Sequence, residues 1–156
     1  MKFETFRYGT INIQPEDIYT FPEGLLGFPN CNRFTLIDEE SAAPFRILQS
    51  LDISNLAFVV IDPLIVKPDY HFKLTLDDLK VIKTNKVENV SVYSIVNLAK
   101  DIKQATINLQ GPLVLNSKEH LGHQFVLFDE SYSVSEKLVT KPIADKSTKL
   151  KKASNQ

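Results

Sequence analysis

The side chains that could carry out chemistry are few and scattered. Among the three histidines, only His120 and His123 have a spacing found between metal ligands. A protein metal site needs three or four ligands, and the sequence offers no third cysteine, histidine or carboxylate at a matching distance. We therefore interpret residues 120–123 as a loop with two solvated histidines, and we expect neither a metal nor a cofactor.

Nucleophilic and acid–base chemistry are no better supported. The single cysteine, Cys31, would need a base beside it, and the sequence indicates none, so we expect a half-buried thiol in a turn. Phosphate-binding loops, nucleophile elbows and dinucleotide fingerprints are absent from the sequence. We therefore do not expect an enzyme. The alternative that stays open is a hydrolase or other enzyme that uses Asp62, His71 or His123.

Composition places the chain among soluble, single-domain proteins. It has 156 residues, of which 43% are hydrophobic and 24% are charged, close to the averages for globular proteins. A single cysteine cannot form an internal disulfide, which favours a reducing compartment. The N-terminus lacks an apolar signal core, and no apolar run approaches the length of a membrane span. We expect a cytoplasmic protein without membrane contact.

Charge divides the chain into two parts. Residues 141–156 contain five lysines and one aspartate, a net charge of +4, so residues 1–140 carry −5 of the overall −1. We expect a domain over 1–140 and a basic tail over 141–156. The tail is typical of a solvated terminus, and steering of nucleic acid or a partner is the alternative.

Apolar patterning predicts a protein built from short strands. A hairpin around Gly9, a structured loop over 21–29 and one helix over 75–82 are also expected, while 131–139 fits either a strand or a weak helix. The expected strands are 2–8, 10–14, 33–38, 45–51, 56–61, 87–99, 106–109, 113–116 and 124–128. This pattern favours a mainly β fold: a small antiparallel β-barrel or sandwich-like single domain with one or two short helices.

The stretch 56–70 is the centre of this expected fold. Residues 56–61 are apolar without a break and predict a strand buried on both faces. Asp62-Pro63 ends the strand, and Pro68-Asp69-Tyr70 closes a rigid loop in which we expect an exposed tyrosine. Such a loop loses little entropy on docking and suits a binding surface, although stiff turns that only position a strand would have the same sequence.

Several motifs together resemble the flagellar assembly factor FliW family. Phe21–Phe28 (FPEGLLGF) is similar to the FPxGLxGF signature of that family, and Pro44–Ser50 (PFRILQS) is similar to its PFxxLQS segment. Leu56–Pro63, Pro68–Tyr70 and Thr106–Asn116 follow in the family order. The resemblance covers roughly residues 3–135 and leaves the lysine-rich tail outside.

The resemblance implies a cytoplasmic, non-enzymatic protein that switches between partners. Its implied partners are flagellin and, once flagellin is exported, the RNA-binding regulator CsrA, whose repression of flagellin translation is then lifted. The implied fold is a small antiparallel β-barrel-like body. We expect the partner surface to combine the loop 62–70 with the turn 108–112 and two nearby side chains. Its residues are Phe45, Gln49, Asp62, Pro63, Pro68, Asp69, Tyr70, Asn108 and Pro112.

A second hypothesis is that the barrel binds single-stranded nucleic acid directly. Small barrels do so with aromatic side chains that stack on bases and lysines that contact phosphates. The charge of −5 on residues 1–140 opposes this role, and no strand interleaves basic and aromatic residues. We therefore expect no direct contact with nucleic acid.

Overall fold

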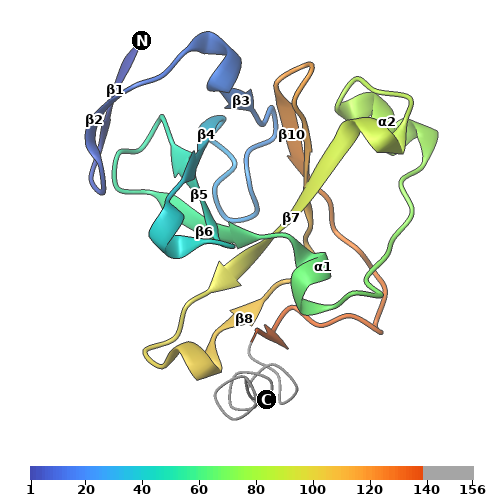
Figure 1. Ribbon diagram of the computed structural model, residues 1–156. Coiled ribbons are helices and arrows are strands. Elements are labelled where there is room, and N and C mark those ends of the chain that lie inside the picture. The colour runs from blue at the N-terminus through green and yellow to red at the C-terminus, as the bar shows by residue number, and fades with distance from the viewer. Residues whose placement is uncertain (139–156) are drawn as a thin grey trace.

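Seven strands close into a barrel in the computed structural model, which describes residues 1–138 (Figure 1). In spatial order they are β7 (Val90–Asn97), β6 (Ala57–Ile61), β5 (Arg46–Ser50), β4 (Arg33–Asp38), β3 (Tyr19–Thr20), β10 (Leu121–Gln124) and β9 (Leu113–Asn116). The pairing of β9 with β7 closes the ring. All neighbours are antiparallel except β3 and β10, which meet in parallel at Thr20 and Leu121.

Two further pairs of strands extend this barrel. Beyond its contact with β9, β7 pairs with β8 (Thr106–Ile107), which in turn pairs with β11 (Glu136–Lys137). The hairpin of β1 (Lys2–Thr5) and β2 (Gly9–Asn12) forms a separate two-stranded sheet beside the barrel (Figure 1). It is held there by a hydrogen bond from the Phe6 N–H to the Ser54 carbonyl oxygen, 2.8 Å long.

Inward-facing strand residues and side chains from the segment 21–31 fill the barrel. The barrel core consists of Phe21, Leu25, Cys31, Phe34, Leu48, Val60, Leu113 and Leu115. Phe21 is accommodated because position 122 is a glycine: a Cβ there would lie 2.6 Å from Cε1 of Phe21 and 2.7 Å from Cδ2 of Leu115. Cys31 belongs to this core and is fully buried, so the expectation of a half-buried thiol is wrong.

A second apolar layer lies outside the barrel wall. The outward residues Val90, Val92 and Val114 pack with Ile82 and Phe125, and a neighbouring cluster gathers around Ile61, Tyr70, Ile107 and Leu109. The connection between the two helices, residues 67–75, supplies Phe72 to both clusters. This outer layer explains why β7 and β9 are apolar on both faces.

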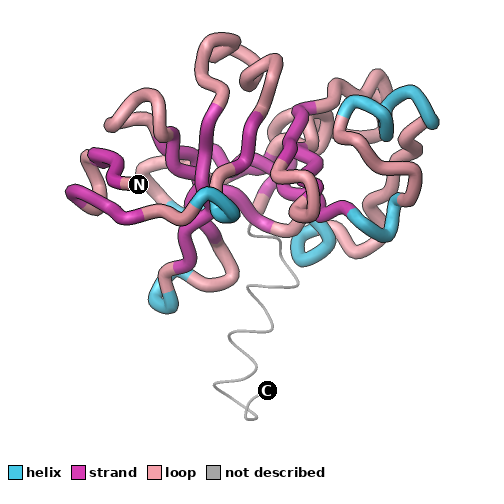
Figure 2. Tube along the Cα trace, turned by 90° about the horizontal axis from the view of Figure 1, so that it is seen from above, coloured by secondary structure: helices cyan, strands magenta, loops and turns pink. Residues whose placement is uncertain are grey.

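Two short α-helices flank the strands. α1 (Pro63–Val66) follows β6 directly, and α2 (Leu76–Val81) begins with a capping box between Thr75 and Asp78, as its sequence predicts. Short 3₁₀ turns occupy Pro15–Asp17, Glu40–Ala42, Val87–Asn89 and Ile102–Gln104. Figure 2 shows the helical segments at the periphery of the strands.

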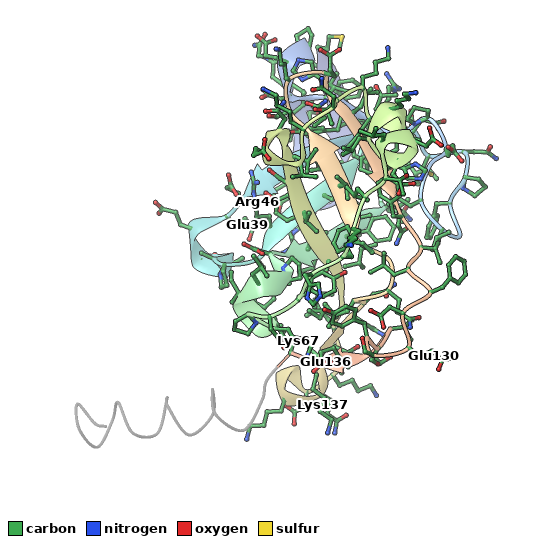
Figure 3. All side chains as sticks on the ribbon, turned by 90° about the vertical axis from the view of Figure 1, so that its right-hand side faces the viewer. Glu39, Arg46, Lys67, Glu130, Glu136 and Lys137 are labelled. Atoms are coloured by element: carbon green, nitrogen blue, oxygen red, sulfur yellow. The ribbon has the colours of Figure 1, made fainter. Side chains whose placement is uncertain are left out.

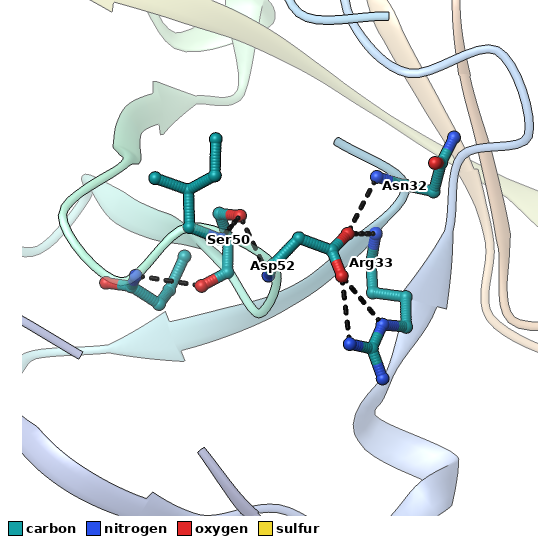
Figure 4. Close-up of polar contacts among 6 residues, drawn as sticks. Asn32, Arg33, Ser50 and Asp52 are labelled. Atoms are coloured by element: carbon teal, nitrogen blue, oxygen red, sulfur yellow. Dashed lines mark hydrogen bonds and ion pairs between the residues drawn. The ribbon is translucent and has the colours of Figure 1, made fainter. Parts of the chain in front are cut away.

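Polar side chains fix the turn between β5 and β6 (Figure 4). The amide nitrogen of Gln49 donates to the carbonyl oxygens of Ser50, Ser54 and Leu56 at 3.0 to 3.3 Å. The carboxylate of Asp52 accepts from the backbone N–H of Arg33 at 3.0 Å and from its guanidinium Nε at 2.9 Å. The Ser50 hydroxyl accepts from the N–H groups of Asp52 and Ile53 at 3.1 and 2.9 Å, so the glutamine and serine of the PFRILQS segment both order this turn.

The expected fold class, a mainly β single domain with two short helices, is confirmed, while several expected elements need correction. The expected strand over 124–128 is wrong, because β10 covers Leu121–Gln124 and residues 125–128 do not continue it. The open choice for 131–139 resolves to a turn followed by the two-residue strand β11 within the described residues. β6 is buried at its end but exposed at Ala57, so it is not buried on both faces throughout. The expected tail, 141–156, lies outside the described residues.

Candidate partner-binding surface

The segment after β6 begins as a helix. The carboxylate of Asp62 accepts a hydrogen bond from the Leu64 N–H at 2.9 Å and so caps α1, whose first residue is Pro63. Proline suits this position because its fixed φ is helical and it lacks only an N–H that has no partner there. One turn of helix follows, and it presents Leu64 and Ile65 to solvent, each with 50% of its surface exposed.

Tyr70 is buried, which corrects the expectation of an exposed tyrosine. Only 6% of its surface is accessible, and its hydroxyl donates to the carbonyl oxygen of Leu109 at 2.7 Å. Its ring packs edge-on against Tyr132, with 4.7 Å between ring centroids. Burial, with a smaller contribution from Tyr132, raises the pKa of Tyr70 above its ordinary value.

The hydrogen bond between Tyr70 and Leu109 joins the loop 62–70 to the turn 108–112. The turn 108–112 is ordered by Asn108, whose side-chain oxygen accepts from the Gln110 N–H at 2.9 Å, and it ends at the buried Pro112. Phe45 is half-buried and packs against the same cluster as Tyr70 and Leu109. Phe45, the loop 62–70 and the turn 108–112 therefore form one continuous region.

Gln49 is not part of that region. In the antiparallel register of β5 and β6, Gln49 faces Ala57 and Arg46 faces Val60. Gln49 thus lies near the opposite end of β6 from Asp62, about 16 Å away along the strand at 3.3 Å per residue. It is fully buried and holds the β5–β6 turn, as described above.

A groove of about 470 Å³ opens between α1, the connection 67–75 and the outer face of β7. We call it the α1 groove. Its lining includes Asp62, Pro63 and Tyr70 from the predicted set, and its walls are mostly apolar. Leu64 also lies in the predicted loop 62–70. The lining residues outside the predicted surface are His71, Phe72, Leu74, Val87, Val90, Ser91, Val92 and Tyr93. The alternation of Phe72 and Leu74 was the signal that could have identified one wall.

Charged side chains of both signs lie at the rim of the α1 groove. Asp62 and Asp69 are exposed, and Lys67 forms an ion pair with Asp69 that is 3.9 Å long and open to solvent. Such a pair contributes little to stability, so its groups stay available to a partner. Of the predicted site residues, only Asp62, Pro68 and Asp69 are exposed, whereas Gln49, Pro63, Tyr70 and Pro112 are buried.

The residues considered for catalysis are not gathered in one place. Asp62 and His71 line the α1 groove, but His123 lies in β10, where its ring packs on Phe125 at 4.5 Å. The expectation that residues 120–123 form a loop with two solvated histidines is therefore wrong, since His123 is half-buried in a strand. Within residues 1–138, no three potential ligands lie together as a metal site requires. In the same range, no helix is long and apolar enough to span a membrane.

Comparisons with known proteins agree with one another. The family model described as FliW protein matches residues 2–138. A flagellar assembly factor FliW of Natranaerobius thermophilus is 37% identical over 139 residues, covering 88% of this chain and 92% of its own. Its counterpart in Ruminiclostridium cellulolyticum is 36% identical over 135 residues, covering 86% and 91%. A crystal structure of the flagellar assembly factor FliW superposes with a TM-score of 0.84 at 33% identity, over 90% of this chain and 99% of that one.

Proposed function

The chain belongs to the FliW family of flagellar assembly factors, and we propose that it binds flagellin and, once freed, the RNA-binding regulator CsrA. CsrA held in this way no longer represses flagellin translation, so flagellin synthesis follows flagellin export. The activity is docking without a chemical step, in keeping with relatives that are named assembly factors rather than enzymes. It takes place in the cytoplasm, where both partners are made.

The observation that carries this proposal is the family match over residues 2–138, supported by the charge of the body. Residues 1–140 carry a net charge of −5. An RNA-binding protein presents basic side chains to phosphates, so opposite charges favour its encounter with this body. The same negative charge repels RNA itself, which supports antagonism by protein contact rather than competition for RNA.

We place the docking surface at the α1 groove and its rim. Leu64 and Ile65 supply exposed apolar area, while Asp62 and Asp69 supply charge. Beneath them, the buried Tyr70 and its bond to Leu109 hold the surface in shape. A rigid surface with a few apolar anchors loses little entropy on docking, so such anchors carry most of the binding energy.

Calorimetry with purified flagellin and with CsrA tests both function and placement. The double substitution Leu64→Ala and Ile65→Ala should weaken at least one partner tenfold or more, about 1.4 kcal/mol. Leu98→Ala is the matched control, because Leu98 is 54% exposed but follows β7 at the other end from the groove lining. Unchanged affinity for both partners would reject this placement. If the unaltered protein bound neither partner, the proposed function itself would be wrong.

Direct binding of single-stranded RNA is the competing function, and the same protein samples test it. Labelled RNA should stay unshifted when this protein is added alone and should be released from CsrA when the protein is added to their complex. A salt-dependent shift by the protein alone would favour the nucleic-acid hypothesis.

A further inference from the structure

Residues 125–128 have the sequence of a strand but are hydrogen-bonded on one side only. The N–H groups of Phe125 and Leu127 donate to the carbonyl oxygens of Pro112 and Gln110, at 3.0 and 2.8 Å. Backbone groups of successive residues in an extended chain point in opposite directions, so those of Val126 and Phe128 point away from this contact. Within residues 1–138, no hydrogen bond engages the backbone N–H or carbonyl groups of Val126 and Phe128.

The unpaired groups of Val126 and Phe128 lie on the same edge of the chain as the β10 residues that pair with β3. That pairing is near the start of β10. The Thr20 N–H donates to the His120 carbonyl oxygen at 2.8 Å, after which the chain leaves β10 and enters the loop 21–29. The loop contacts the end of β10 through side chains of that strand: the Leu26 N–H donates to the side-chain oxygen of Gln124 at 2.9 Å, and the Glu23 carboxylate lies 3.9 Å from the His123 ring nitrogen. From Val126 onward none of the described residues pairs with this edge, and the exposed Leu26 lies at its start.

Apolar side chains accompany the unpaired backbone. Val126 and Phe128 alternate with the inward-packing Phe125 and Leu127, and Phe128 is 92% exposed. Natural edge strands are normally protected by lysine, proline or a covering element, because an exposed apolar edge recruits other strands. Residues 125–128 contain neither lysine nor proline. The combination of free backbone groups and exposed apolar side chains specifies an extended peptide as the ligand.

Charge restricts the kind of peptide. Residues 120–136 contain Asp129, Glu130 and Glu136 but no lysine or arginine, and the loop 21–29 adds Glu23. The hollow beside residues 125–129 adds Asp78 and one cation, Lys73, so carboxylates outnumber cations around this edge. Glu130 projects from the surface next to this segment (Figure 3). Hydrogen bonds from Ser131 lower the pKa of Asp129, so this carboxyl is ionised at neutral pH. A second copy of this chain would place like charges together, whereas a basic peptide complements them.

We propose that the edge at Val126 and Phe128 binds an extended segment of a partner protein, in which apolar residues alternate with lysine or arginine. The segment adds as one more strand beyond the end of β3, and its apolar residues cover Leu26, Val126 and Phe128. This site is separate from the α1 groove and does not rest on the proposed function there.

Amide hydrogen exchange on the full chain tests strand addition directly. The probe is a synthetic peptide of alternating valine and lysine. At saturating peptide, exchange at the Val126 and Phe128 amides should slow at least tenfold, while the already bonded Phe125 and Leu127 amides should change little. Absence of this protection would overturn the proposal. Protection of the two amides without peptide would overturn it too, because a second copy or residues 139–156 would then occupy the edge.

Matched variants distinguish strand addition from nonspecific hydrophobic binding of the peptide. A peptide with N-methylated valines keeps the side chains but loses the backbone donors, and it should bind at least tenfold more weakly; equal binding would overturn the proposal. Phe128→Ser should weaken the original peptide, whereas Phe6→Ser should not, because Phe6 is 85% exposed but lies in the β1–β2 hairpin. Binding of flagellin and CsrA to the α1 groove should be unchanged in Phe128→Ser. A failure of the peptide-binding proposal can therefore be distinguished from a failure of the proposed function.

Discussion

The hydroxyl of Tyr70 donates to the carbonyl oxygen of Leu109 across 39 residues of sequence, and this bond joins the loop after β6 to the turn before β9. Replacing Tyr70 by phenylalanine keeps the ring and leaves a buried carbonyl without its donor. We expect Tyr70→Phe to lower the free energy of unfolding by about 1 to 3 kcal/mol. Urea denaturation measures it, and Tyr19→Phe provides a comparison, because Tyr19 is half-buried and its hydroxyl makes no hydrogen bond within residues 1–138. A Tyr70→Phe variant as stable as the parent would contradict this role.

The same tyrosine predicts a loss of stability in alkali. Because burial raises the pKa of Tyr70, the folded protein keeps this proton at a pH where the unfolded chain, with a pKa near 10, releases it. The stability that Tyr70 contributes is complete below pH 10 and is lost as the pH rises further. The difference in unfolding free energy between the parent and Tyr70→Phe should therefore shrink above pH 10. A difference that stays constant would show that Tyr70 titrates normally.

Asp62 should stabilise α1 through its cap rather than its charge. Asp62→Ala removes the acceptor for the Leu64 N–H, and we expect a loss of about 1 kcal/mol. Asn is an equally good cap without the charge, so Asp62→Asn should retain the stability. Thermal unfolding of the two variants side by side separates the effects, and an equal loss in both would assign the effect to charge.

Gly24 and Gly27 offer a matched pair within one loop. Both have positive φ, +66° and +86°, but a Cβ on Gly24 would lie 2.7 Å from backbone carbons of Pro29 and closer still to the Phe28 carbonyl, whereas one on Gly27 meets nothing within 4 Å. Gly27→Ala should cost only the left-handed strain, about 1 to 2 kcal/mol. Gly24→Ala should cost clearly more, because the backbone must move. Denaturant midpoints of the two variants compare them, and equal midpoints would refute the clash.

Asp52 predicts a matching loss of stability in acid. Partial burial opposes its ionisation, but hydrogen bonds from Asn32 and Arg33 prevail and lower the pKa of Asp52. Its contribution is present above the unfolded pKa near 4 and is lost as the pH falls through the lower folded value. Asp52→Asn should therefore unfold with less dependence on pH below 4. Asp77→Asn, on an exposed residue of α2, is the control and should follow the parent.

Local signals in the sequence predicted the elements best. Asp62-Pro63 marks the end of β6, and Thr75 caps α2, because each depends on residues next to it. Burial was predicted less well. Tyr70 follows Pro68 and Asp69 and therefore resembles a loop residue, but its environment is set by Leu109 and Tyr132, which are distant in the sequence. The sequence thus predicted that Phe45 and both loops lie together, but it did not predict which of their side chains are exposed.

Strand register and ladder length could not be predicted from the sequence, because they depend on which strands lie side by side. Gln49 follows Phe45 by four residues, yet the register with β6 carries it to the far end of that strand. Residues 124–128 have strand composition throughout, but the ladder with β9 ends at the pair of Gln124 and Leu113. The next residue, Phe125, faces Pro112, which has no N–H to donate. Closure of the barrel between β7 and β9 likewise joins strands that no local pattern connects.

β7 contributes side chains to the barrel core and to both clusters of the outer layer, and this has a consequence for unfolding. One of its edges pairs with β6, while the other pairs first with β9 and then with β8, and its side chains alternate between the barrel interior and the outer layer. Melting of either layer removes the wall on which the other rests. The protein should therefore lose both layers in one all-or-none transition, with the calorimetric and van't Hoff enthalpies equal.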